Sequence, residues 1–264
     1  EDFLRPMRIL AGIAQVAATA GHRVRLYDVR PGAVETAIAN LGRTLETLVA
    51  KGKMGADKAE LVKGRLEPAE GLADLDVCAL VVEAIAEDLE AKRKLFAELE
   101  AIVARDCILA SNTSSLSISA VARGLERPGR VAGFHFFNPA PVLNLVELVS
   151  TVTTDAAVTE SVHAFLDSLD RAVVEVRDRP GFIANGLLFG YLHHAAAMYS
   201  ERYASREDID AAMRFGCGYP IGPLALLDLI GLDTAYDILD AMYHDSRDRL
   251  HAPTPLLRQL VTAG

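Results

Sequence analysis

A histidine and a glutamate are placed for acid–base chemistry on the two sides of a predicted hairpin. His135 lies within the aromatic run FHFF and Glu147 within the apolar run VEL. The two positions are symmetric about Pro141, which ends the turn sequence NPAP. If the chain folds back here as an antiparallel pair, the two side chains lie opposite each other and make contact. A carboxylate beside an imidazole orients the ring and raises its pKa, as a general base requires.

The competing interpretation is that His135 is an ordinary core residue. A lone histidine in an apolar strand usually has its hydrogen bonds satisfied and no chemical role. Glu147 favours chemistry, because a charged glutamate inside a buried strand needs a partner, and His135 is the only cationic candidate in the hairpin sequence. The remaining histidines have no such setting and are expected to be structural: His22, His163, His193, His194, His244 and His251.

Composition predicts a folded globular protein. The chain has 264 residues, enough for one large domain or two ordinary ones, and 51% of them are hydrophobic. No apolar run is long enough to span a bilayer and no signal peptide is evident. The net charge of −9 argues against nucleic acid as a partner. The three cysteines (Cys78, Cys107 and Cys217) lack metal-ligand spacing, so we expect buried thiols, no metal and a cytoplasmic location.

Helical and strand patterns alternate along the first two thirds of the chain. The predicted order is a helix at 11–20, a strand at 23–28, a helix from Pro31, a strand at 77–82 buried on both faces, a helix to about residue 105 and a strand at 107–110. This order predicts a Rossmann-like, doubly wound α/β sheet. After a strand at 172–176 only helical patterns follow, including helices at 182–203, 207–215 and 224–243. We therefore expect an α/β domain over 1–178 and a smaller all-helical domain over 179–264.

Two polar stretches each allow two interpretations. Residues 43–65 carry six basic and three acidic side chains, a local charge of +3. They form either a solvated helix face or the binding site of a phosphorylated ligand. The cluster SNTSS at 111–115 follows a predicted strand, at the edge where such sheets bind ligands. Capping of the next helix is the simpler explanation for its serines and threonine.

Seven motifs together resemble the L-3-hydroxyacyl-CoA dehydrogenase family, which includes the 3-hydroxybutyryl-CoA dehydrogenases. The resemblance covers residues 11–264 and rests on these motifs in order: AGIAQVAATAGH at 11–22, LYD at 26–28, VVEAIAEDLEAK at 81–92, SNTSS at 111–115, GFHFFNPAPVLNLVELV at 133–149, DRPGFIANGLL at 178–188 and GCGYPIGPLALLDLIGLDT at 216–234. It implies NAD-dependent oxidation of (S)-3-hydroxyacyl-CoA to 3-oxoacyl-CoA, in fatty-acid, butanoate or aromatic-acid degradation.

The resemblance also implies catalytic roles by position. His135 matches the base that takes the proton of the 3-hydroxyl while hydride leaves C3, and Glu147 matches its orienting partner. Ser114 is similar to the family serine beside the substrate oxygen and the nicotinamide. Asn185 matches the asparagine from the helical domain that completes the site, and its position in the middle of a predicted apolar helix is unusual for asparagine.

Further positions match family contacts to the cofactor and to coenzyme A. Asp28 resembles the acid on the adenosine ribose, which favours NAD over NADP because a carboxylate repels a 2′-phosphate. The family also implies NAD contacts at Glu87, Lys92 and Asn138, besides Ser114. Thr44 and Lys51 match positions that touch coenzyme A, so the acyl-CoA substrate supplies the anion for the basic stretch. The family implies a homodimer, for which the apolar residues at 224–232 of the helical domain are suitable.

The sequence departs from the family at its beginning. The family pattern is a strand, then G-x-G-x-x-G, then the AGIAQ helix, whereas here Leu10 stands where the last glycine belongs. Residues 7–10 run into Ala11 without a turn residue, which a strand entering an antiparallel helix requires. Either several residues that belong between Leu10 and Ala11 are missing, or the protein has lost the turn and no longer binds NAD. The first explanation is favoured and predicts an interruption of the chain at this point.

Two rival functions remain open from the sequence. One is a non-catalytic relative that keeps the fold as a structural or binding protein, without a working glycine-rich loop. The other is a dehydrogenase that acts on a hydroxy acid or sugar acid without coenzyme A. The basic stretch at 43–65 argues against the second rival.

Overall fold

The computed structural model describes residues 5–264, with side chains from Ile9 onward. The chain forms two compact units. The α/β unit consists of the residues up to Thr113 together with Ile118–Asp178. The helical unit consists of Ser114–Ser117 and Arg179–Gly264.

The α/β unit begins with a layer that carries its own small sheet. Its elements are α1 (Arg5–Ala20), β1 (Val24–Leu26), α2 (Ala33–Ala50), α3 (Ala56–Lys63) and β2 (Leu66–Pro68). β1 and β2 pair in parallel as a separate two-stranded sheet. α2 buries Val34, Leu41 and Leu45 in a cluster with Leu26 of β1, which holds the end of β1 beneath the helix.

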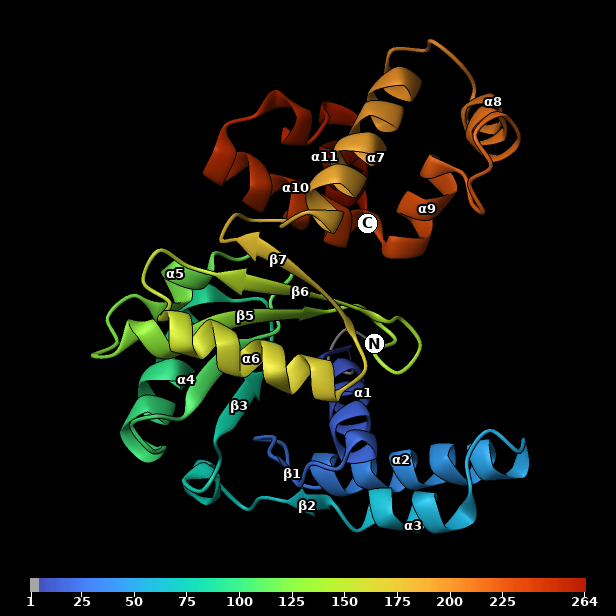
Figure 1. The fold of residues 1–264 in the computed structure, drawn as a ribbon. Helices are drawn as coiled ribbons and strands as arrows, with labels where there is room; N and C mark the ends of the chain where they lie inside the picture. The colour runs from blue at the N-terminus through green and yellow to red at the C-terminus, as the bar shows by residue number, and fades with distance from the viewer. Residues whose placement is uncertain (1–4) are drawn as a thin grey trace. The chain divides into compact units, whose positions relative to one another are not determined.

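The larger sheet has five strands in the order in which the chain meets them. They are β3 (Leu80–Glu83), β4 (Ile108–Ser111), β5 (Val131–Phe136), β6 (Leu145–Ser150) and β7 (Ala172–Arg177). Figure 1 labels β3 and β5 to β7. β3, β4 and β5 are parallel, β5 and β6 are antiparallel, and β6 and β7 are parallel. The carboxyl ends of β3 to β5 therefore meet the start of β6 at one edge, which is where such sheets place their ligand sites.

Helices cover both faces of this sheet. They are α4 (Leu89–Ile102), α5 (Ile118–Ala122) and α6 (Ala156–Ser168), with short 3₁₀ turns η2 (Leu72–Leu75) and η3 (Pro128–Arg130). Side chains of α6 and α1 pack on alternate residues of β5 and β6, among them Phe134, Phe136, Val146 and Leu148. Because side chains alternate between the faces of a strand, His135 and Glu147 point to the opposite face. That face also holds Gly133 against Ile118 of α5.

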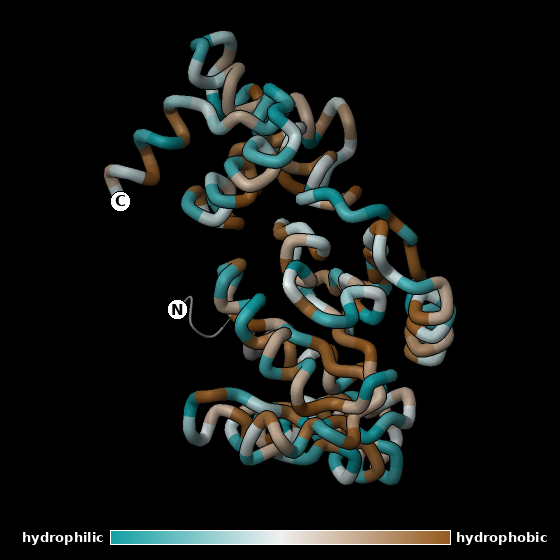
Figure 2. The backbone as a smooth tube through the Cα atoms, turned by 90° about the vertical axis from the view of Figure 1, so that its left-hand side faces the viewer, coloured by the Kyte–Doolittle hydropathy of each residue, from teal (hydrophilic) through white to brown (hydrophobic). Residues whose placement is uncertain are grey.

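Every described element of the second unit is helical. The unit contains α7 (Ala184–Ser200), α8 (Arg206–Ala211), the π-helical turn η4 (Ala212–Gly216), α9 (Pro223–Ile230), α10 (Leu232–Ser246), the 3₁₀ turn η5 (Arg249–His251) and α11 (Pro255–Ala263). The expected single helix at 224–243 is wrong, because Gly231 adopts φ 97° and separates α9 from α10. α11 alternates hydrophobic and hydrophilic residues (Figure 2) and inserts Leu257 into the core of the unit.

The predicted fold class is confirmed, but the helix predicted at 11–20 and the strand predicted at 77–82 differ from the prediction. α1 is helical without interruption through Leu10 and Ala11, so the expected break in the chain is wrong. The physical reason is local: Met, Arg, Ile, Leu and Ala favour helix, and Pro6 is tolerated in a first turn. Among the described residues no strand consequently joins the β1–β2 sheet to the edge of the larger sheet at β3. β3 is therefore an edge strand and only half-buried along Leu80–Val82, whereas the sequence predicted burial on both faces.

The three cysteines lie in different environments. Cys107 is buried as expected, Cys78 is half-buried and Cys217 is exposed. The expectation is therefore wrong for Cys217, which follows η4 in a turn rather than filling a core position. Among the described helices, none has the length and apolar character needed to cross a membrane.

Replacing Gly133 by alanine is expected to destabilise the strand that carries His135. A Cβ at this position would lie 2.8 Å from both Ile118 Cδ1 and Val149 Cβ, in a fully buried layer. Overpacking of this kind costs about 1–3 kcal/mol, which urea unfolding would measure. Gly71→Ala is the matched control, because its backbone is extended and its Cβ meets no atom within 4 Å. Equal stability of the two variants would contradict the close packing at Gly133.

Candidate active site

The structure pairs His135 with Glu147 across β5 and β6. The two residues are opposite partners in the antiparallel register. His135 Nδ1 lies 2.6 Å from Glu147 Oε2, and the residues are only 5% and 1% exposed. The contact predicted from symmetry about Pro141 is thus confirmed. In this low-dielectric setting the carboxylate fixes the orientation of the ring and engages Nδ1, which directs proton exchange to Nε2.

The end of β4 helps to hold this histidine in place. The side-chain Oδ1 of Asn112 accepts a hydrogen bond from the backbone N–H of Phe136, at 3.0 Å. The ring of Phe137 lies against the imidazole, with ring centroids 4.4 Å apart. Sequence reasoning treated Asn112 only as part of a polar cluster. Its place directly after a strand was the available signal, since an amide side chain there can bridge to the neighbouring strand end.

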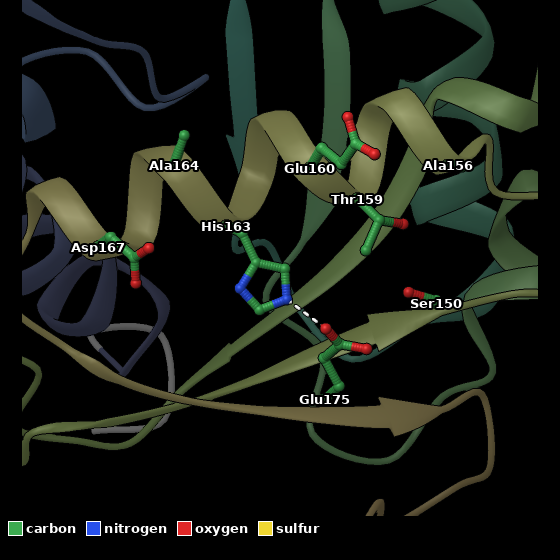
Figure 3. Close-up of a pocket in the computed structure, with 8 residues that line it drawn as sticks. All are labelled: Ser150, Ala156, Thr159, Glu160, His163, Ala164, Asp167 and Glu175. Carbon is green, nitrogen blue, oxygen red and sulfur yellow. Dashed lines mark hydrogen bonds and ion pairs between the residues drawn. The ribbon is translucent and has the colours of Figure 1, made fainter.

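A second His–Glu pair shows that spacing alone does not define such a site. His163 of α6 and Glu175 of β7 are also twelve residues apart, and their Nε2 and Oε1 atoms lie 2.5 Å apart. Their side chains are 31% and 64% exposed. They line an open cavity of about 710 Å³ together with the acidic side chains of Glu160 and Asp167 (Figure 3). Solvent screens an exposed pair, so this one lacks the dry setting of His135.

Lys92 is buried in an ion pair rather than exposed to a ligand. It is 1% exposed, and its Nζ lies 2.7 Å from Glu83 Oε1 and 3.4 Å from Glu87 Oε2. Ser111 Oγ donates to Glu83 Oε2 at 2.7 Å, which extends the network from β3 to β4. The enclosed ammonium group favours a structural role for Lys92, and its direct contact with the cofactor stays a prediction. Glu83 and Ser111 were missed, although a glutamate ending an apolar strand is a recognisable signal.

Asp28 lies just beyond β1 and is engaged by its own chain. Its carboxylate accepts hydrogen bonds from the backbone N–H, Nε and Nη2 of Arg30, each at 2.9 Å. The Arg30 side chain thereby holds the pKa of the Asp28 carboxyl below its usual value. The acid is in the position expected for a ribose contact, but it must share its oxygens with Arg30 to make one. A neighbouring arginine also weakens the argument for NAD over NADP, since arginines accommodate a 2′-phosphate.

The start of the α/β unit, as far as it is described, lacks the glycine turn that usually holds the pyrophosphate of a dinucleotide. That group needs free backbone N–H groups at a glycine turn and a helix N-terminus. In α1 the backbone N–H groups of Ile9, Leu10 and Ala11 lie in the helix interior, where they bond to carbonyls four residues earlier. Gly12 serves packing instead: a Cβ there would lie 3.2 Å from Pro141 Cδ, in the turn that follows β5.

Asn185 and Ser114 come together within the helical unit. Asn185 Nδ2 donates to the backbone oxygen of Ser114, at 3.4 Å. Asn185 is the second residue of α7, so its expected position in the middle of the helix is wrong. Helix α5, which follows the Ser/Thr cluster, is capped by Asp178. The Asp178 carboxylate accepts hydrogen bonds from the backbone N–H groups of Ile118, at 2.8 Å, and Ser119, at 2.7 Å.

The remaining predicted ligand positions lie on the surface of the α/β unit. Thr44 and Lys51 are exposed at the end of α2, where Thr44 Oγ1 donates to Asn40 O at 3.0 Å. Part of the basic stretch is structural, since Lys63 bridges Glu46 and Glu60 at 3.0 Å each. Asn138 is exposed in the turn after β5. Over the described residues, no three His, Cys, Asp or Glu side chains gather to hold a metal ion.

Replacing Lys92 by methionine is expected to destabilise the α/β unit by about 3–5 kcal/mol, because Glu83 would remain buried without its cation. The double variant Lys92→Met/Glu83→Gln should recover part of this loss, since it removes the unpaired charge. Chemical unfolding of the full chain measures both. The control is Lys94→Met on the same helix, whose side chain is 81% exposed. A loss in Lys92→Met no larger than in that control would refute the structural role of Lys92.

Comparisons with known proteins assign both parts of the chain to one family. Residues 8–179 match the model of the 3-hydroxyacyl-CoA dehydrogenase NAD binding domain, and residues 181–264 match the C-terminal domain of the same family. The chain is 40% identical to a probable 3-hydroxybutyryl-CoA dehydrogenase of Bacillus subtilis, over 96% of this chain and 88% of the relative. It is 41% identical to human mitochondrial hydroxyacyl-coenzyme A dehydrogenase, over 95% and 82%.

Solved structures agree with this result. FadB2 of Mycobacterium tuberculosis superposes with a TM-score of 0.91 at 40% identity, covering 97% of this chain and 91% of that one. The (S)-3-hydroxybutyryl-CoA dehydrogenase PaaH1 of Ralstonia eutropha gives 0.93 at 36% identity, covering 96% and 90%. Both parts of the chain, the sheet with its buried His–Glu pair and the helical unit, are thus accounted for by one group of proteins. The chain belongs to the 3-hydroxyacyl-CoA dehydrogenase family.

Proposed function

We propose that the protein is an NAD-dependent dehydrogenase that interconverts (S)-3-hydroxyacyl-CoA and 3-oxoacyl-CoA. The observation that carries the proposal is the buried contact between His135 and Glu147, at 2.6 Å. Relatives named as 3-hydroxybutyryl-CoA dehydrogenases, alike over nearly the whole chain, support the choice of substrate class. A 3-hydroxyacyl-CoA has one hydroxyl proton to lose on oxidation, and the His–Glu pair is suited to receive it.

The proton chemistry follows from how the imidazole is held. Glu147 engages Nδ1, so Nε2 of His135 takes the proton from the 3-hydroxyl group during oxidation and returns it during reduction. The developing imidazolium is stabilised by the adjacent carboxylate, as in Ser-His-Asp enzymes. NAD supplies the acceptor for the hydride when it is bound. His135 is thus the catalytic base and Glu147 its positioning residue.

The other family positions take supporting roles in the proposal. Ser114 and Asn185 hold the substrate oxygen, an assignment supported by their hydrogen bond within the helical unit. Asp28, Glu87 and Asn138 contact NAD. Lys92 acts indirectly, because its ammonium group orients the Glu87 carboxylate.

Coenzyme A and a second subunit complete the proposed assembly. Thr44 and Lys51 contact the coenzyme A moiety from the exposed end of α2. The helical unit forms a homodimer through apolar residues that its own core leaves exposed, among them Leu229, which is 73% exposed within the predicted 224–232 stretch. The proposed location is the cytoplasm.

A second candidate is a non-catalytic relative of the family. The observation that favours it is the uninterrupted helix α1, which takes the place of the turn that would approach the pyrophosphate. Such a protein keeps the His135–Glu147 contact but binds NAD weakly or not at all. The two experiments below separate these candidates.

Substitution of His135 by glutamine is expected to lower kcat for 3-hydroxybutyryl-CoA by about 10²–10⁴-fold, because the general base is lost. Glu147→Gln should reduce kcat less, and the formation of NADH measures both. His163→Gln is the matched control, since it removes the exposed histidine of the second His–Glu pair. Activity of His135→Gln equal to that of the control would rule out the proposed base.

Substitution of Asp28 by alanine is expected to weaken NAD binding by about tenfold, because one charge-assisted hydrogen bond to the ribose is lost. Calorimetric titration of the full chain with NAD measures this effect. Asp106→Ala, at an exposed aspartate before β4, is the control. The absence of any NAD binding to the unaltered chain would instead favour the non-catalytic candidate.

A further inference from the structure

A second cavity of the α/β unit has the character of an anion site. It has a volume of about 450 Å³, within the usual range of ligand pockets, and it lies among α1, the end of α2, the start of α3, the turn after β5 and the turn between α6 and β7. Its polar lining includes the basic side chains of Arg171 and Lys58, the acidic side chain of Asp170, and Asn144, Ser168, Thr19 and Gln15, so basic groups outnumber acidic ones by two to one. Its apolar lining comes mainly from α1 and α2 and from Met54.

Arg171 enters this lining as a cation, and the carboxylate of neighbouring Asp170, which also lines the cavity, forms no ion pair with it. Its Nη1 donates to Asn144 Oδ1 at 3.1 Å and, at the limit of a hydrogen bond, to Leu143 O at 3.5 Å. Its Nε is buried and finds no acceptor among residues 5–264. Within the same range no carboxylate forms an ion pair with it. Burial lowers the pKa of the guanidinium, and the charge of neighbouring Asp170 opposes this only in part. A partly buried, unpaired cation is unfavourable until an anion reaches it.

The backbone around Arg171 is held by a left-handed residue before it and a hydrogen bond after it. Asp170 adopts the left-handed conformation, with φ 54°, which is uncommon for a residue other than glycine and is found most often where position matters. Directly after Arg171, the N–H of Ala172 donates to the backbone oxygen of Asn144 at 2.9 Å. Asn144 therefore holds this turn through both its backbone and its side chain. The guanidinium is pre-positioned, which lowers the entropic cost of binding.

Lys58, an exposed residue of α3, provides a second positive charge to the lining. It lies in the first turn of α3, and the described residues offer its ammonium group no ion-pair partner. Leu48 of α2 also lines the cavity. Thr44, Leu48 and Lys51 share one face of α2, because residues three and four apart are neighbours on a helix. The cavity thus continues the surface on which the coenzyme A contacts are proposed.

The cavity beside α6 provides a contrast. It is lined by Glu160, Asp167 and Glu175, and its only basic side chain, His163, is already paired with Glu175 (Figure 3). An anion would be repelled there. The two cavities differ in charge, and only the one at Arg171 combines unpaired cations with an apolar wall.

We propose that the cavity between Arg171 and Lys58 binds a phosphate group, with the guanidinium of Arg171 as its main contact. A planar guanidinium matches the oxygens of phosphate, and the ammonium of Lys58 adds a second positive charge from α3. The phosphate belongs either to the coenzyme A moiety, in which case the site rests on the proposed function, or to a free phosphate-bearing molecule. In both cases the main contact is Arg171, a residue to which the family resemblance assigns no role.

The test is calorimetric titration of the full chain with inorganic phosphate and, separately, with coenzyme A. Phosphate is expected to bind the unaltered protein, and Arg171→Gln is expected to weaken it by about tenfold or more, because a charge-assisted contact is lost. Lys58→Gln should weaken binding by a smaller factor. Arg171→Lys should retain part of the affinity, which separates loss of charge from loss of fold. Arg105→Gln, at an exposed arginine, should bind as the unaltered protein does.

The coenzyme A titration identifies the source of the phosphate. A parallel loss of coenzyme A affinity in Arg171→Gln supports a coenzyme A phosphate, whereas unchanged coenzyme A affinity with lost phosphate binding supports a free phosphate compound. Phosphate that fails to bind the unaltered protein, or that binds Arg171→Gln equally well, overturns the proposal. Neither titration uses NAD or turnover, so failure of the dehydrogenase activity would leave the result readable.

Discussion

The register of β5 against β6 is the constraint on which the candidate site depends. Opposite positions in this antiparallel pair bring His135 and Glu147 to 2.6 Å, and a shift of one residue would turn either side chain to the other face of the sheet. The register is supported on both sides. The aromatic and aliphatic residues of one face are packed beneath α6 and α1, and Gly133 leaves room for Ile118 on the other. The geometry of the pair is therefore a property of the whole hairpin.

The strand ends next to this hairpin are held together by buried polar bonds. Asn112 ties the end of β4 to β5, and Ser111 ties β4 to Glu83 at the end of β3. Lys92 neutralises Glu83 from the adjoining helix. A network of this kind is favourable only when every member is satisfied, so it fixes the edge at which a ligand would bind. Residues that resemble ligand contacts in the sequence act here partly as supports for that edge.

The start of α1 departs from the sequence pattern of the family. Where a glycine turn would expose backbone N–H groups, residues with good helix propensity continue α1 instead. The sheet is consequently divided into β1–β2 and β3–β7. Among the described residues the acid–base pair is present, whereas a glycine turn for the pyrophosphate is not. Affinity for NAD is thus the property on which the dehydrogenase function of this chain depends.

The sequence by itself determined the features that arise from local order. The alternation of helix and strand predicted the α/β fold, and symmetry about Pro141 predicted the His135–Glu147 contact, because a short turn fixes the register of the strands beside it. The tertiary structure alone decided burial. His163 and Glu175 have the same separation in sequence as the central pair, yet they face solvent. Lys92 matches a cofactor contact of the family, yet its side chain lies buried beside Glu83. Elements distant in the chain decide which side chains are excluded from solvent. This exclusion distinguishes a buried acid–base pair from a surface contact.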